Sequence, residues 1–313
     1  MQSSVNPLKP KFAEFLQGEV RRMVLLGRTV NRLPQEVAAL YRESVDTGEH
    51  DDFRELSGLL FGAKDRYRSA RATISYTVDG AVAEESNRRF VDWRFAQPGG
   101  SGMGKLRTEE ERRAHGPDVP RDFYLTYEDA ERVVRLWHER PDRWREERRT
   151  PQGALLGCVV AAGRHAPLWM YEPPETAIHV PSVPERRDPD PLLAFMLDPS
   201  EEVVYYSLWD DATVRKTGRT TTVAGRGALE VEIGTVSWGY PPRMFRSYYA
   251  PEGTTDHLLL VDAEVGTILR VAARLEGREF WVAEVTEIAY DEEFSEDTFR
   301  LEMPGVEFRR VVR

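Results

Sequence analysis

The hydrophobic pattern of this chain changes at Arg71-Ala72-Thr73-Ile74-Ser75-Tyr76-Thr77-Val78, a stretch rich in β-branched and aromatic residues. Residues of these types in alternation are typical of a β-strand. Asp79-Gly80 follows at once and indicates a hairpin-type turn. The stretch therefore marks the start of a region of strands.

Upstream of this stretch, apolar residues recur every three or four positions, which is typical of amphipathic helices. The spacing predicts helices over residues 12–26, 34–44 and 52–69, and Asp51 or Asp52 is placed to cap the third. We therefore expect residues 1–48 to form an N-terminal helical extension, and residues 49–313 to form the main domain.

Downstream, short apolar stretches bounded by Gly, Pro or Asp predict many further strands. Residues 89–95 alternate, with Val91, Trp93 and Phe95 on one face. The other strands are expected at residues 131–138, 142–148, 154–161, 167–171, 203–209, 219–224, 228–236, 257–262, 267–275 and 279–290. Residues 191–197 are the main apolar stretch of helical character between them. Helices followed by many strands predict an α+β chain with a large antiparallel sheet.

The composition limits the function classes. The chain has 313 residues, of which 41% are hydrophobic and 31% charged, so a sizeable core is expected. A formal net charge of −10 argues against broad electrostatic binding to nucleic acid. Mean hydropathy is −0.53, and no apolar run approaches the roughly 18 residues that a transmembrane helix needs. The first residues lack a secretory signal pattern, so we expect a cytoplasmic protein.

No motif in the chain predicts a catalytic residue, a metal or a cofactor. Residues 99–105 match the spacing of a phosphate-binding loop, but Leu106 stands where a magnesium-binding Ser or Thr is required. The six histidines lack the spacing of metal ligands. Asp256 and His257 are neighbours in a predicted strand, so their side chains point to opposite faces. Cys158 lies in an apolar strand, where a thiol is buried and unreactive.

The seven tryptophans all lie in or beside predicted strands. Such residues either pack in the core and pair across strands, or turn an aromatic face toward a ligand cavity. The residues alone leave both interpretations open.

Several stretches, in order along residues 50–304, resemble the LolA-like superfamily of lipoprotein carriers and periplasmic sigma-factor regulators of the RseB type. One is Gly163-Arg164-His165-Ala166-Pro167-Leu168-Trp169-Met170-Tyr171-Glu172-Pro173, similar to a family strand with Gly, Trp, Tyr and Pro. Another is Val261-Asp262-Ala263-Glu264-Val265-Gly266-Thr267-Ile268-Leu269-Arg270, similar to a family hairpin with the pattern D-x-x-t-G. The others are residues 67–78, 140–146, 190–193 and 223–230, and residues 290–294 with Phe299.

The resemblance implies a strongly curved, antiparallel, unclosed β-barrel with helices on its concave side. It also implies non-catalytic binding or carriage of a lipid-like ligand, so the expected partner is a hydrophobic small molecule or an acyl chain. Residues 192–197 would cover part of the inner face, and an acyl chain could displace them. The candidate ligand-binding residues are Trp93, Phe95, Trp137, Trp144, Trp169, Tyr171, Leu193, Phe195 and Met196.

Two alternatives remain open. The first is a regulatory module of the RseB type, in which residues 1–48 grip a protein partner. The second is an enzyme that uses the same cavity, with an acid or base drawn from Asp92, His138 or Glu139. These three residues do not have a spacing that general acid–base catalysis would demand.

Overall fold

The computed structural model describes residues 51–96, 127–163, 167–174, 176–181, 193–199, 212–235, 253–303 and 305–310. Several predictions fall on other parts of the chain. The helical extension over residues 1–48, the glycine-containing loop at residues 99–105 and the strand at residues 203–209 all lie outside the described residues.

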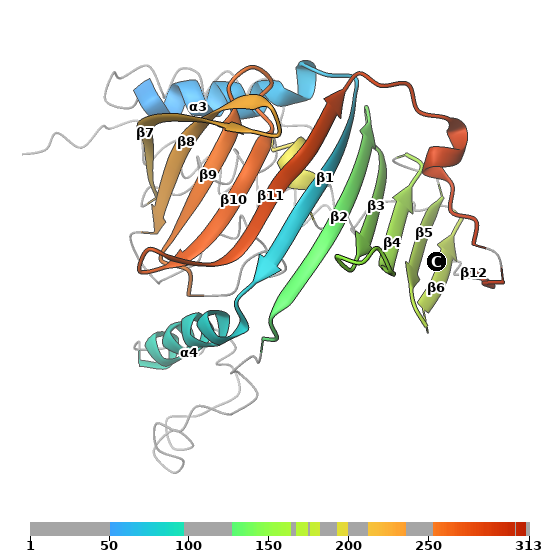
Figure 1. The fold of residues 1–313 in the computed structure, drawn as a ribbon, viewed down its shortest axis with the longest axis horizontal. Coiled ribbons are helices and arrows are strands. Elements are labelled where there is room, and N and C mark those ends of the chain that lie inside the picture. Colours follow the sequence, from blue (N-terminus) through green and yellow to red (C-terminus); the bar gives the residue numbers. More distant parts are fainter. Residues whose placement is uncertain are drawn as a thin grey trace, which may run out of the picture.

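Twelve strands form one sheet, in the order β12-β6-β5-β4-β3-β2-β1-β11-β10-β9-β8-β7 (Figure 1). All neighbouring strands pair antiparallel except β12 and β6, which are parallel. The strands are β1 (Ser69–Val78), β2 (Ala130–Glu139), β3 (Arg143–Arg149), β4 (Leu155–Ala161), β5 (Leu168–Glu172), β6 (Thr176–Val180), β7 (Ala212–Val223), β8 (Arg226–Thr235), β9 (Asp256–Asp262), β10 (Ile268–Leu275), β11 (Arg278–Tyr290) and β12 (Arg309–Arg310).

The described part of the chain is mostly β, and its sheet is neither closed nor strongly curled (Figure 1). The prediction of an unclosed antiparallel sheet is confirmed, but the prediction of strong curvature is wrong. Helices pack against one face of the sheet, and a helix with its side chains is about 10–12 Å across. This layer holds apart strands that would approach one another in a tightly curved sheet.

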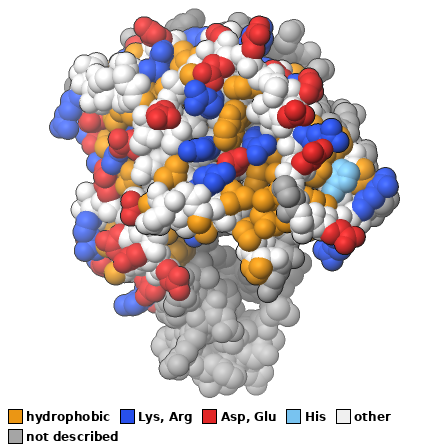
Figure 2. Space-filling model, turned by 45° about the vertical axis from the view of Figure 1, so that its right-hand side comes forward, with side chains coloured by type: hydrophobic (Ala, Val, Ile, Leu, Met, Phe, Trp, Pro, Cys, Tyr) orange, Lys and Arg blue, Asp and Glu red, His pale blue; other side chains and the backbone are white. Residues whose placement is uncertain are grey.

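Strand alternation divides the sheet into two chemically different faces. The inner face carries Ile74, Leu136 and Leu259, each at most 1% exposed, as part of the main hydrophobic core. On the opposite, outer face Arg71 pairs with Glu292 and Arg270 pairs with Glu284, each at 2.8 Å. Figure 2 shows Lys and Arg side chains close to Asp and Glu side chains, with hydrophobic side chains among them. Because charges of both signs are mixed, the face seen in Figure 2 has no extended patch of a single charge sign.

Three α-helices accompany the sheet in the described ranges: α3 (Asp51–Gly62), α4 (Gly80–Ala96) and α6 (Ala194–Leu197). Short 3-10 turns are η1 (Ala63–Asp65) and η3 (Glu296–Phe299). Figure 1 shows α3 across one end of β7 to β10, and α4 beyond the opposite end of β1. The apolar stripe of α3 includes Leu56 and Leu60, which are buried in the main core, as its sequence spacing predicts.

Helix α4 corrects two predictions at once. Asp79-Gly80 begins this helix and does not form a hairpin turn, and residues 89–95 are helical, not a strand. The Asp79 carboxylate accepts a hydrogen bond from the Val82 backbone N–H at 3.1 Å, which is the function of an N-cap. Buried side chains of α4 in its described part fall at helical spacing; among them are Val82, Ala83, Ser86, Asn87, Phe90 and Val91.

The outer face has a second, smaller core on the β2–β6 side. Cys158, Val160, Phe299 and Leu301 form its buried centre, and the C-terminal segment around η3 covers it. Cys158 is 1% exposed and its burial raises the pKa of the thiol to about 12, which confirms the predicted unreactive cysteine.

The turn between β9 and β10 fixes α3 to the sheet. The buried Asp262 carboxylate accepts the Val265 backbone N–H at 3.0 Å, and the Asp262 carbonyl accepts that of Gly266 at 2.9 Å. Gly266 has a φ of +88°, and a Cβ built there would overlap the Leu59 carbonyl oxygen of α3. The Arg66 guanidinium also donates to the Leu59 carbonyl, at 2.9 Å. Only glycine fits this close approach of helix and turn.

Gly266→Ala should therefore destabilise the fold far more than Gly277→Ala. Gly277 also has a positive φ, +80°, but a Cβ there would meet nothing within 4 Å. Backbone strain alone costs about 1–3 kcal/mol, and Gly266→Ala adds a steric clash. In chemical denaturation, Gly266→Ala should lower the free energy of unfolding by at least about 2 kcal/mol more than Gly277→Ala does. Equal losses for the two variants would contradict the close packing of α3 on this turn.

His257 lies on the inner face and makes the stability depend on pH. It is 4% exposed, and burial, with the nearby Arg274 charge, lowers its pKa to about 3. The unfolded chain takes up a proton near pH 6.5, whereas the folded chain does not do so until about pH 3. The contribution of neutral His257 is therefore complete above pH 6.5 and is lost as the pH falls toward 3.

Denaturation at pH 7, 6, 5 and 4 should show the free energy of unfolding falling with a slope that approaches about 1.4 kcal/mol per pH unit from this residue. His257→Gln should remove most of that slope between pH 6.5 and 4.5. His179→Gln is the matched control at a partly exposed histidine and should change the slope less. An unchanged profile in His257→Gln would overturn the assignment.

Candidate functional site

The candidate site lies on the inner face of the sheet, where α6 and the preceding Leu193 are buried. The exposed fractions of residues 193–197 are 0%, 8%, 6%, 0% and 0%. Helix α6 packs against β10 and belongs to the main core. We call residues 193–197 the plug. A helix of four residues has no independent stability, so its burial on the sheet holds it in place.

One end of the plug is held by a buried hydroxyl. Tyr67 Oη donates a hydrogen bond to the Leu197 carbonyl at 2.8 Å. Tyr67 Oη also lies 2.8 Å from His138 Nδ1. Because the hydroxyl proton goes to Leu197, His138 Nδ1–H donates to the Tyr67 oxygen. Burial raises the pKa of Tyr67, so the group stays a neutral phenol.

Further contacts surround this hydroxyl. The Arg140 guanidinium lies over the Tyr67 ring, 4.4 Å from its centre, and pairs at 3.2 Å with Asp198, the residue after the plug. The His138 ring stacks on Trp144, with 3.6 Å between ring centres and 3° between ring planes. These residues form a rigid aromatic and polar frame beside the end of the plug.

The other end of the plug meets a buried carboxylate on β3. Glu146 is 2% exposed and its Oε2 accepts the Leu193 backbone N–H at 3.3 Å. Arg148 lies on the same face of β3, with its Nε 3.6 Å from Glu146 and its Nη2 2.6 Å from Glu172. The three side chains form a polar track from the buried plug to the more exposed Glu172.

The apolar surface of the sheet under and beside the plug, which we call the bed, continues over β5 and β6. Leu168 lies opposite Val180, and Met170 lies opposite Ile178 in the strand register. All four are only partly buried. Because directly opposite residues share a face, and Met170 lies opposite Val159 and hence in line with Glu146, these side chains are on the inner face.

The structure divides the predicted ligand-binding residues between the two faces. Trp144 shares the inner face with the buried plug, which includes the predicted Leu193, Phe195 and Met196. The predicted residues on the outer face, packed against the second core, are Trp137, Trp169 and Tyr171. Trp93 and Phe95 lie in helix α4, and their side chains are outside the described set. The nine residues therefore do not line one cavity.

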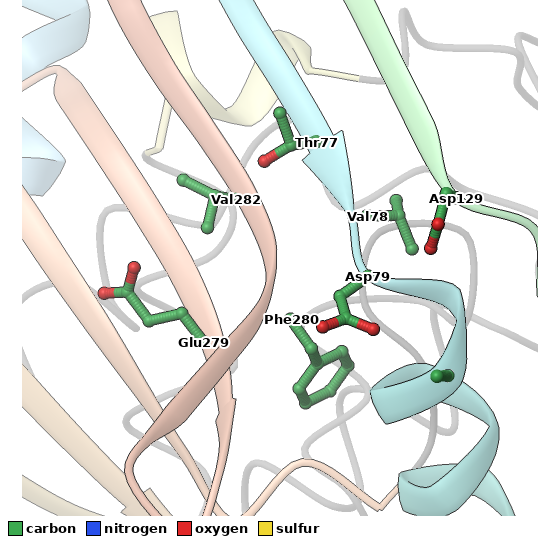
Figure 3. Close-up of a pocket in the computed structure, with 8 residues that line it drawn as sticks. Thr77, Val78, Asp79, Asp129, Glu279, Phe280 and Val282 are labelled. Carbon is green, nitrogen blue, oxygen red and sulfur yellow. The ribbon is translucent and has the colours of Figure 1, made fainter.

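Two of the surface pockets in the described part are considered in turn, and neither of these two is lined by the plug. One, of about 430 Å³, lies where β1 ends and α4 begins (Figure 3). Its carboxylates already have partners: Asp79 caps α4, Asp129 accepts the Gly80 N–H at 2.8 Å, and Glu279 pairs with Arg270 at 2.6 Å. The other, of about 460 Å³, lies between β5, β6 and residues 305–309.

The residues considered for an enzyme are not brought together. His138 is fully buried beside Tyr67, while Glu139, the next residue of β2, pairs with Arg143 at 2.5 Å. Asp92 is exposed on α4. Within the described ranges no group of three or more His, Cys, Asp and Glu side chains is arranged to hold a metal ion. No helix in those ranges is long and apolar enough to cross a membrane.

The polar residues that hold the plug were not predicted from the sequence; they are Tyr67, Arg140 and Glu146. For Glu146 a signal exists. Glu146 and Glu147 are neighbours in a strand that carries Trp144, so alternation places Glu146 on the same face as Trp144 and Glu147 on the other. An acidic residue whose position in the strand places it on the apolar face is a functional candidate.

Tyr67→Phe should loosen the plug. The variant loses the hydrogen bond to the Leu197 carbonyl, and the free energy of unfolding should fall by about 1–3 kcal/mol, the cost of an unmet buried polar group. Under native conditions, chymotrypsin should cleave the variant after Phe195 or Leu197 faster than it cleaves the wild-type protein, as measured by mass spectrometry. Tyr76→Phe, which loses a bond from Trp281 Nε1 of 3.0 Å, is the control. Cleavage that rises equally in both variants would contradict a local effect.

Comparisons with known proteins give similarity of fold. Neither a protein-family model nor a curated protein sequence matches this chain. A conserved protein from Thermus thermophilus, described as uncharacterised, matches with a TM-score of 0.41 and 10% identity, over 84% of this chain and 100% of that chain. The Pseudomonas aeruginosa MucA/MucB complex matches with a TM-score of 0.41 and 15% identity, over 80% of this chain and 61% of that chain.

A LolA superfamily protein from Nitrosomonas europaea matches with a TM-score of 0.29 and 8% identity, over 79% of this chain and 97% of that chain. This chain thus spans all of the Thermus protein but about three fifths of the MucB chain. The predicted resemblance is confirmed as structural similarity to MucB and LolA superfamily proteins at low identity, over about 80% of this chain.

Proposed function

We propose that this protein binds a hydrophobic, lipid-like ligand on the inner face of its sheet, in place of the plug, and carries it without catalysis. The observation that carries the proposal is the burial of residues 193–197, a single short helical turn, inside the main core. An apolar bed that is covered by so short a segment can accept another apolar group of similar size.

The energies of the two occupants are comparable. Burial of a large apolar side chain is worth about 1.5–3 kcal/mol, so the four large side chains of the plug together contribute about 6–12 kcal/mol. A ten-carbon acyl chain at about 0.8 kcal/mol per buried methylene contributes about 8 kcal/mol. Neither occupant dominates, so exchange of plug for ligand is reversible.

The bed supplies the surface that such a ligand needs. Trp144 offers an aromatic wall, and the partly exposed Leu168 and Met170 extend the apolar surface beyond the plug. Apolar ligands are bound by surfaces of this kind with few polar contacts. Of the nine predicted ligand-binding residues, we propose Trp144 as part of the bed and Leu193, Phe195 and Met196 as the displaced group.

Phe195→Ala should tighten ligand binding while it destabilises the free protein. The ligand competes with the plug, so a weaker plug raises the apparent affinity for a fluorescent fatty-acyl probe, here by at least about tenfold. The free energy of unfolding should fall by about 3–5 kcal/mol, as for other buried Phe→Ala changes. Both quantities are measured on the full chain, by probe titration and by denaturation.

Phe299→Ala is the matched control because Phe299 is 2% exposed in the second core on the outer face. It should lose a similar amount of stability and leave the probe affinity unchanged. Native mass spectrometry and lipid extraction of the purified wild-type protein should find bound acyl lipid. A protein that binds no acyl probe, or binds it equally in both variants, contradicts the proposal.

The regulatory alternative depends on a partner held by residues 1–48, which lie outside the described residues. It remains a prediction from the sequence. A chain lacking residues 1–48 that keeps its ligand but loses a partner would favour it.

A further inference from the structure

The plug is followed directly by a carboxylate. Residues 193–197 are buried, whereas Asp198 is partly exposed. The Asp198 side chain pairs with the Arg140 guanidinium, with 3.2 Å between Asp198 Oδ2 and Arg140 Nη1. Residues 193–198 thus place an apolar body on the bed and an anionic group at its partly exposed end. A fatty acid has the same arrangement, with an apolar chain and a carboxylate head.

Arg140 is held in position by contacts that do not involve the plug. Its backbone N–H donates to the Arg68 carbonyl at 3.0 Å, and its Nε donates to the Tyr67 carbonyl at 3.1 Å. The guanidinium also lies over the Tyr67 ring, 4.4 Å from its centre. The segment before β1 therefore fixes the positive charge at this end of the bed.

Arg140 also has an unused hydrogen-bond donor. Nη1 donates to Asp198, whereas Nη2 is buried and has no hydrogen-bond partner among the described residues. A guanidinium can present two N–H groups to the two oxygens of one carboxylate. A carboxylate that is not tethered to the chain can approach both donors, so it can bind Arg140 more strongly than Asp198 does.

The arginine at the other end of the plug, Arg148, is flanked by two acids. Its Nη2 bonds to Glu172 at 2.6 Å, and its Nε lies 3.6 Å from Glu146. Both acids belong to strands of the sheet, so they stay in place without the plug. An anionic head at that end would meet two carboxylates. At the Arg140 end, the paired acid belongs to the segment that the ligand replaces, and the charges therefore favour a head at Arg140.

We propose that the ligand is a single-chain amphiphile with a carboxylate head, a fatty acid, which pairs with Arg140 in place of Asp198 while its chain replaces residues 193–197 on the bed. This inference rests on the proposed function and names its ligand class. The head lies at the partly exposed end of the bed, so it keeps part of its hydration. Neutral esters and cationic amphiphiles with the same chain bind more weakly.

Three ten-carbon probes test the proposal: decanoate, methyl decanoate and decylammonium. They are titrated against the full chain at pH 7, in competition with the fluorescent fatty-acyl probe. Decanoate should bind at least about tenfold more tightly than its methyl ester, a difference of about 1.4 kcal/mol. Hydrophobicity alone predicts the opposite order, because the neutral ester is the more apolar of the two. Decylammonium should bind most weakly, although the net charge of −10 on the protein attracts it.

Two variants connect the preference to one side chain. Arg140→Gln should reduce the decanoate-to-ester affinity ratio to within about threefold, because the amide carries no positive charge. The ratio is measured because loss of the pair with Asp198 also loosens the plug, which raises the apparent affinity for both probes by the same factor. Arg143→Gln is the control: the Arg143 side chain is similarly exposed, 22% against 19%, but lies over Phe299 on the outer face. It should keep the wild-type ratio.

The outcomes separate this inference from the proposed function. If the wild-type chain binds methyl decanoate as tightly as decanoate, or more tightly, the carboxylate head is wrong and hydrophobic binding stands. If none of the three probes binds, the proposed function fails. A preference for decanoate that persists unchanged in Arg140→Gln would overturn the assignment to Arg140. The wild-type comparison decides the ligand class even if a variant does not fold.

Discussion

The burial of a single helical turn on the apolar face of the sheet is the constraint on which the rest of this structure depends. Strand alternation gathers the apolar residues of nine strands, β1 to β4 and β7 to β11, on one face, and exposure of that face to water would remove most of the driving force for folding. Helices α3 and α6 cover it. Helix α3 is fixed by the close contact with Gly266, whereas α6 is too short to hold itself in place.

The polar groups around α6 follow from its length. In a helix of one turn almost every backbone N–H and C=O lacks a partner within the helix, and a buried one must find a partner elsewhere. Tyr67 supplies a donor for the Leu197 carbonyl, and Glu146 supplies an acceptor for the Leu193 N–H. These two groups remain on the sheet and on the segment before it when the plug is absent.

Much of the sheet could be predicted because the alternation of apolar residues along a strand is visible in the sequence, whatever the strand packs against. Eight of the strands outside the first, among them β2, β9 and β11, fall close to their predicted ranges. Helix α4 was missed because residues 89–95 fit alternation as well as helical spacing, and the deciding contacts, such as that between the Gly80 N–H and Asp129, are remote in sequence. The curvature could not be predicted either, since it depends on how thick a layer of helices the inner face must hold.

The candidate site was predicted in part for a similar reason. The apolar character of residues 191–197 identified the plug. Aromatic residues were grouped by type, which placed Trp137 and Trp169 with Trp144, although the alternation of side chains along the strands puts them on opposite faces of the sheet. Tyr67 and Arg140 could not be found at all, because their roles arise from a meeting of β2 with the segments before β1 and after α6.

The most direct test of the account is hydrogen exchange of the backbone amides at residues 193–198, measured by mass spectrometry with and without a saturating concentration of the fluorescent fatty-acyl probe. Displacement of the plug predicts faster exchange of these amides in the complex, while the amides of β1 keep or gain protection. Slower exchange at residues 193–198 on binding, or no change, would show that the ligand does not take the place of the plug and would contradict the account.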